Sequence, residues 1–85
     1  MRHNYFENNK LVFNSRSKLL TYITKEVLAG KREFYFRVSG KIKPQEMMQE
    51  ANDCIVNCLR LNGQNKIRVK SRINESIGVC WLKVL

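Results

Sequence analysis

Two lysines, Lys41 and Lys43, precede Pro44 at the point where an alternating segment gives way to a helical pattern. Pro44 suits the first turn of a helix, because its missing N–H group would make no intrahelical hydrogen bond there. The backbone N–H groups and the dipole at a helix N-terminus both favour an anion. The two lysines add positive charge at the same place. The spacing therefore predicts a turn that binds phosphate.

Further cations lie in two other segments of the chain. Arg16 and Lys18 stand before an amphipathic segment, and residues 66–72 read KIRVKSR, with a cation at every second position. This period-two alternation is typical of a strand with one buried face. The cations share the other face, where they repel one another unless that face is solvated or meets phosphate. We expect these residues to contact nucleic-acid phosphates: Arg16, Lys18, Arg37, Lys41, Lys43, Arg68, Lys70 and Arg72.

Two aromatic residues extend the prediction from phosphates to bases. Tyr35 lies in EFYFRV and Trp81 in VCWLKV, and both segments alternate like half-buried strands. An aromatic side chain on an open sheet face can stack an unpaired base, which contributes about 1–3 kcal/mol. The alternative for both residues is ordinary packing, in the core or at a dimer interface. Tyr35 and Trp81 are the candidates for base stacking.

The sequence offers no catalytic constellation. No nucleophile has a base at a recognisable spacing, and His3 is the single histidine. Cys54 and Cys58 lie four residues apart on one helix face, and Cys80 lies in a predicted strand. Such positions are typical of small buried hydrophobic residues, and a metal site would need more ligands. We therefore expect no enzyme, no metal site and no cofactor.

The charge balance points to a polyanionic partner. The 85 residues contain 16 Lys and Arg against 7 Asp and Glu, which gives a formal net charge of +9. Such a lopsided balance favours nucleic acid as the partner. An odd number of cysteines argues against a closed disulfide framework. The absence of an apolar leader or long apolar span predicts an intracellular protein, cytoplasmic or, in a eukaryote, nuclear, with no membrane partner and no small-molecule substrate.

Six segments must position these residues. The patterns predict strands over residues 10–13, 33–39, 66–72 and 79–85. They predict a first helix that begins after Ser15 or Ser17 and ends before Gly30, and a second helix over residues 44–61. Residues 1–9 are expected to form a flexible N-terminal arm, and residues 10–85 a single domain.

The predicted order β-α-β-α-β-β defines the fold class. Right-handed crossovers put both helices of two successive β-α-β units on the same face of a sheet. We therefore expect an α/β (α+β) two-layer sandwich, with a four-stranded mixed sheet and two helices on one face. The other face would carry Tyr35, Arg37, Arg68 and Lys70, together with Trp81 and Lys83.

Two stretches resemble the Alba superfamily of small nucleic-acid-binding proteins. NSRSKLLTYITKEVLAGKREFYFRV is similar to Alba's opening strand, basic loop and first helix, which ends at a glycine before the second strand. VSGKIKPQEMMQEANDCIV resembles the exit of that second strand into the second helix. The resemblance covers roughly residues 11–85 and implies a protein that binds DNA or RNA, usually as a dimer. It implies contacts from Arg16, Lys18, Lys41, Lys43 and Arg72.

Two departures from the Alba pattern bear on the ligand. Ser17 separates Arg16 from Lys18, where the family commonly has adjacent lysines, and the hairpin segment RINESIG is short and contains Glu75. A short hairpin with an acidic residue argues against a basic arm that reaches along a DNA groove. RNA is therefore favoured as the ligand. FYFRVSGKIKPQEM also resembles part of the C-terminal domain of translation initiation factor three, which implies RNA and a monomer.

Two functions stay open on this basis. The first is a nucleic-acid-binding protein, for RNA, DNA or both, that contacts phosphates through basic loops and a basic strand face. We expect it to be a homodimer or heterodimer, on the Alba resemblance alone. The alternative is a structural subunit of a larger complex that docks an acidic partner protein through the same basic face.

Overall fold

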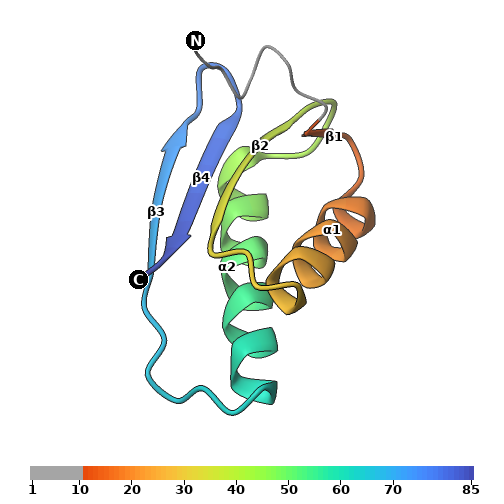
Figure 1. Cartoon of the computed structure of the whole chain (residues 1–85). Coiled ribbons are helices and arrows are strands. Elements are labelled where there is room, and N and C mark those ends of the chain that lie inside the picture. The colour runs from red at the N-terminus through yellow and green to blue at the C-terminus, as the bar shows by residue number, and fades with distance from the viewer. Residues whose placement is uncertain (1–10) are drawn as a thin grey trace, which may run out of the picture.

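Two helices and four strands follow one another in the predicted order (Figure 1). The computed structural model describes residues 11–85, so the predicted N-terminal arm and Lys10 lie outside the described residues. The elements are β1 (Val12–Phe13), α1 (Arg16–Leu28), β2 (Glu33–Val38), α2 (Pro44–Leu61), β3 (Val69–Asn74) and β4 (Val79–Val84).

The four strands form one mixed sheet in the order β1-β2-β4-β3. β1 runs parallel to β2, whereas β4 is antiparallel to both of its neighbours, β2 and β3. The predicted fold class, a four-stranded mixed sheet with two helices, is confirmed. β1 pairs with the C-terminal end of β2, where Val12 and Phe13 lie opposite Arg37 and Val38.

The ends of α1 follow from its sequence. Ser15 is the N-cap, and its hydroxyl accepts a hydrogen bond from the backbone N–H of Lys18 at 3.4 Å. This satisfies one of the N–H groups that a helix start leaves without an intrahelical partner. Gly30 follows the helix with a φ of 102°, as the sequence predicted for its C-terminal stop.

The core lies between the helices and one face of the sheet. Leu19, Ile23 and Val27 recur every four residues on α1 and are buried, and α2 buries a row with the same spacing, from Met47 to Leu59. The sheet contributes alternate residues of β2 and β4: Phe34, Phe36, Val38, Cys80 and Leu82. These strand residues of the core cluster share one side of the sheet, so both helices cover that side, as predicted.

Both predicted limits of β3 are wrong, and β2 and β4 each end one residue before their predicted limit. β3 begins at Val69 and not at residue 66, so Lys66 and Arg68 precede the strand. The physical reason is the length of the partner strand, because Val69 already pairs with Val84, the last residue of β4. β3 also continues to Asn74, which leaves a turn of only residues 75–78 before β4.

Candidate nucleic-acid interface

Three connections meet at one end of the sheet, which we call the loop end (Figure 1). They are residues 14–15 before α1, residues 39–43 before α2 and residues 75–78 between β3 and β4. The backbone N–H of Ser39 donates to the carbonyl of Phe13 at 3.0 Å, and that of Val38 donates to the carbonyl of Gly78 at 3.1 Å. The fold therefore brings the turn that carries Lys41 and Lys43 close to the start of α1 and to the turn that carries Glu75.

The turn before α2 has the features of an anion site. Lys43 occupies the N-cap position but its side chain makes no capping hydrogen bond, and Pro44 begins the helix. Gly40 adopts a φ of 73°, a conformation that residues with a side chain rarely take. Lys41 and Lys43 are exposed, and within residues 11–85 neither forms an ion pair. Both ammonium groups are available to a ligand at this helix N-terminus.

The two cations at the start of α1 differ from each other. The Nε of Arg16 lies 2.7 Å from Oε1 of Glu50 on α2, and this is the single ion pair between residues of the described range. Lys18 is exposed and its ammonium has no acidic partner there. Exposed ion pairs contribute only about 0–1 kcal/mol, so a phosphate could displace Glu50. To contact a phosphate as predicted, Arg16 must exchange Glu50 for it, whereas Lys18 has no acidic partner to give up.

The sheet surface away from the helices, which we call the open face, is organised in rows across the strands. Pairing places Tyr35 opposite Trp81 and Trp81 opposite Arg72. The next row joins Glu33, Lys83 and Lys70 in the same way. Arg37 begins the row nearest the loop end, followed by Val79 and Asn74. The open face thus combines two aromatic rings with four cations and one acid.

Glu33 connects the two aromatic side chains of the open face. Its Oε2 accepts a hydrogen bond from Nε1 of Trp81 at 2.6 Å and another from the hydroxyl of Tyr35 at 3.1 Å. The hydrogen bond from Trp81 is the main cause that holds the pKa of the Glu33 carboxyl below its usual value, with smaller help from Tyr35 and the charge of Lys83. One carboxylate therefore fixes both rings. Sequence reasoning did not assign Glu33 any role.

Arg72 completes this arrangement on the side of β3. Its guanidinium carbon lies 5.9 Å from the centre of the Trp81 ring, within the range of a cation–π contact. The rings of Tyr35 and Trp81 are 6.4 Å apart and tilted by 49°. Arg72 is exposed, so this contact is of the weaker kind, about 0.5–1 kcal/mol.

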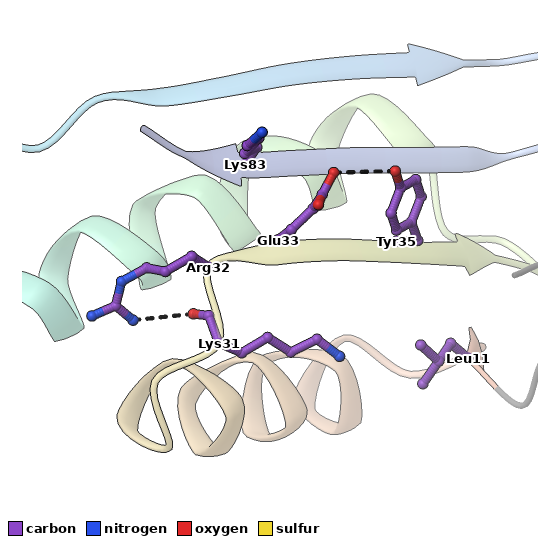
Figure 2. A pocket seen from close by; sticks show the side chains of 6 residues that line it. All are labelled: Leu11, Lys31, Arg32, Glu33, Tyr35 and Lys83. Atoms are coloured by element: carbon purple, nitrogen blue, oxygen red, sulfur yellow. Dashed lines mark hydrogen bonds between the residues drawn. The ribbon is translucent and has the colours of Figure 1, made fainter.

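A hollow of about 450 Å³ lies beside Glu33 at the edge of β2, away from the loop end (Figure 2). Figure 2 shows Glu33 and Tyr35 reaching toward each other, with Lys83 beside them on β4. The cations of the connection before β2 are partly engaged by the protein. The ammonium of Lys31 donates to the hydroxyl of Tyr22 at 3.2 Å, and Arg32 donates to the carbonyl of Lys31 at 3.1 Å. These cations were absent from the predicted contact residues: Lys31, Arg32 and Lys83.

Two predicted contact residues differ from the others in position or exposure. Arg68 precedes β3, and its carbonyl accepts a hydrogen bond from the backbone N–H of Leu85 at 2.9 Å, at the end of the sheet opposite the loop end. Arg37 belongs to the open face but is only half exposed. Its Nε is buried and finds no hydrogen-bond partner among the residues that the structure describes. Lys70 and Arg72, by contrast, are exposed on the same surface.

The three cysteines are free. Burial raises the pKa of the Cys80 thiol to about 11 and also raises the pKa of Cys54, whose sulfur lies 3.2 Å from the hydroxyl oxygen of Thr24. Raised pKa values keep these thiols protonated and poorly nucleophilic. Within residues 11–85, no three His, Cys, Asp or Glu side chains are grouped to hold a metal ion. No helix of that range is long and apolar enough to cross a membrane.

The chain is thus a small α+β protein whose sheet is covered by helices on one side and carries cations and aromatic rings on the other. No protein-family model, no curated protein and no solved structure gives a significant match to it. The element order and the strand order define the fold class.

Proposed function

We propose that the protein binds nucleic acid, RNA or DNA, through its loop end and its open face. The observation that carries the proposal is the excess of positive charge on the open face. Of the six acids within residues 11–85, four are on the helices, Glu26, Glu46, Glu50 and Asp53, and Glu75 lies in the turn of residues 75–78. The open face holds one acid against four cations: Arg37, Lys70, Arg72 and Lys83. A surface of this kind matches the regular negative charge of a phosphate backbone.

The loop end supplies the phosphate contacts in this proposal. Lys41 and Lys43 extend from the turn before α2, and Lys18 extends from the first turn of α1. Contacts of this type position a nucleic acid and give affinity, but they carry little sequence information. General binding, with weak dependence on sequence, is therefore the expected behaviour.

The resemblance to the Alba superfamily supports the same proposal and adds a dimer to it. Alba proteins contact nucleic acid through the loop before the first helix, the turn before the second helix and the last hairpin, and these three connections correspond to the loop end. The turn of residues 75–78 is too short to form an arm that follows a DNA groove, which favours RNA as the ligand. Light scattering at micromolar concentration tests the dimer, and a mass near 10.1 kDa at every concentration would rule it out.

A fluorescence-anisotropy titration tests the proposed function. The ligands are a short duplex DNA, a single-stranded RNA and a stem-loop RNA, each at 50 and 200 mM salt. Six phosphate contacts would make the affinity fall about 10³-fold between these two salt concentrations. The order of affinities among the three ligands identifies the preferred nucleic acid.

A matched control separates specific contacts from net charge. Lys25 is exposed in the last turn of α1, away from both regions, so Lys25→Gln removes one charge without removing a proposed contact. Lys18→Gln should weaken binding more than Lys25→Gln does. Failure of all three nucleic acids to bind at 50 mM salt would refute the proposal. The acidic protein partner would then be sought by affinity capture on the wild-type protein and on a variant with Lys70 and Arg72 replaced.

A further inference from the structure

We infer that the open face binds unpaired bases of a single-stranded nucleic acid, stacking them on Trp81 and Tyr35 while Arg72 and the neighbouring lysines contact the flanking phosphates. This inference rests on the proposed function and makes it narrower. It assigns the ligand class, a single strand, to one surface of the molecule.

The first argument is that both rings are held in place before any ligand arrives. The polar hydrogen atoms of Trp81 and Tyr35 both point to one carboxylate oxygen of Glu33, at 2.6 and 3.1 Å. With these hydrogen bonds made, a bound base needs to supply no acceptor to the polar group of either ring. Both side chains are half exposed and lie directly opposite each other on adjacent strands. Holding the rings beforehand lowers the entropy lost when a base binds.

The second argument concerns Arg72, which lies over the Trp81 ring at 5.9 Å. An exposed cation–π contact is weaker than the stacking of a base on an aromatic side chain. A base can therefore displace the guanidinium from the ring. Because Arg72 is an exposed side chain on the same row, its displaced guanidinium stays beside the bound strand, where a phosphate can pair with it.

The third argument selects the occupant. A second copy of the chain would meet this surface through a two-fold axis, which brings the same patch to itself. Four cations around one acid would then face four more, so the open face is a poor self-association surface. A duplex presents phosphates, but its bases are already stacked on one another. A single strand offers both phosphates and free base faces.

The experiment compares oligonucleotides that differ only in their bases. A single-stranded RNA, a single-stranded DNA and an abasic strand of equal length are titrated by anisotropy, with a duplex as a fourth ligand. Trp81 is the single tryptophan of the chain, so its fluorescence reports on this surface alone. We expect the base-bearing strands to quench Trp81 and to bind at least fivefold more tightly than the abasic strand.

Variants place the effect on the rings. Trp81→Leu should weaken binding of the base-bearing strand about 5- to 100-fold and leave the affinity for the abasic strand unchanged. Trp81→Phe should keep most of the affinity for the base-bearing strand. Tyr35→Leu is a second, independent variant in case Trp81→Leu does not fold by circular dichroism. Arg72→Gln removes a proposed phosphate contact. Its control is Arg60→Gln, because Arg60 is an exposed arginine at the end of α2.

The outcomes distinguish this inference from the proposed function. Equal binding of abasic and base-bearing strands, or unchanged Trp81 fluorescence at saturation, would overturn the inference and leave phosphate binding intact. Binding of the duplex alone would do the same. A dimer that Trp81→Leu converts to a monomer would make the open face a self-association surface and overturn it. Binding of no ligand would remove both proposals together.

Discussion

The two faces of the sheet use neighbouring residues of the same strand for different purposes. On β2, Phe34 and Phe36 are 0% exposed and pack beneath the helices. Glu33 and Tyr35 alternate with them, stay half exposed and hold the Trp81 ring. One face of this strand therefore stabilises the fold, and the other is the face that we propose binds a ligand. Substitutions on the two faces should therefore separate stability from binding.

The largest expected effect is on the covered face. Phe36→Ala removes a fully buried aromatic side chain and should lower the free energy of unfolding by about 3–5 kcal/mol. Tyr35→Ala, one residue away, removes a half-exposed ring and should cost clearly less, while it weakens binding of single strands. Urea denaturation followed by circular dichroism measures both. Equal losses of stability in the two variants would contradict the division between the faces.

The next effect tests how the turn before β4 is attached to the end of β2. Gly78 has a φ of 69°, and a Cβ added there would lie 3.0 Å from the carbonyl oxygen of Val38. Gly78→Ala should lower the free energy of unfolding by about 1–3 kcal/mol, since both conformation and contact are unfavourable. Gly63 has a similar φ of 88° but nothing within 4 Å of an added Cβ.

Gly63→Ala is therefore the matched control, which carries the conformational cost without the close contact. Thermal and urea unfolding of the two variants isolates the contribution of the contact. If Gly63→Ala is as destabilising as Gly78→Ala, the close approach between the two segments has no energetic weight.

The fold could be predicted from local signals, because residues that start or stop a helix stand at the helix boundaries. Pro44 and the Asn62-Gly63 pair gave the limits of α2, and the alternation of residues 33–38 gave β2. The start of β3 could not be predicted in this way. The cationic alternation continues through Lys66 and Arg68, but β4 ends opposite Val69, and a strand extends only as far as its partner.

The sequence predicted that the residues of the open face share one surface, but it did not predict which of them lie side by side. The cations were found from spacing, whereas the row that joins Tyr35, Trp81 and Arg72 depends on strand register, which local sequence does not specify. The bond from Trp81 to Glu33 spans 48 residues, and the pair of Arg16 with Glu50 spans 34. Local patterns contain no signal for contacts of such sequence separation.

A third substitution acts on binding and leaves the covered face untouched. Replacing both Lys41 and Lys43 by Gln removes two proposed phosphate contacts from the loop end. The slope of log affinity against log salt should fall by about 1.4 for a single strand and about 1.8 for a duplex, and affinity should fall for every sequence alike. Anisotropy titrations over a salt series measure the slope. An unchanged slope would place the phosphate contacts elsewhere.

The smallest effect concerns the acid that organises the open face. The pKa of Glu33 is lowered in the folded protein, mainly because its carboxylate accepts the hydrogen bond from Trp81. A carboxyl group whose pKa is lower when folded stabilises the protein above its unfolded pKa, and this contribution is lost as pH falls through the folded value. The ordinary pKa of this group is 4.5. The difference in free energy of unfolding between the wild type and Glu33→Gln should therefore be larger near pH 6 than well below pH 4.5. Urea denaturation at both pH values measures the difference, while Trp81 emission should titrate in the acid range in the wild type only. A difference that does not change with pH would mean that the carboxylate charge has no part in holding the two rings.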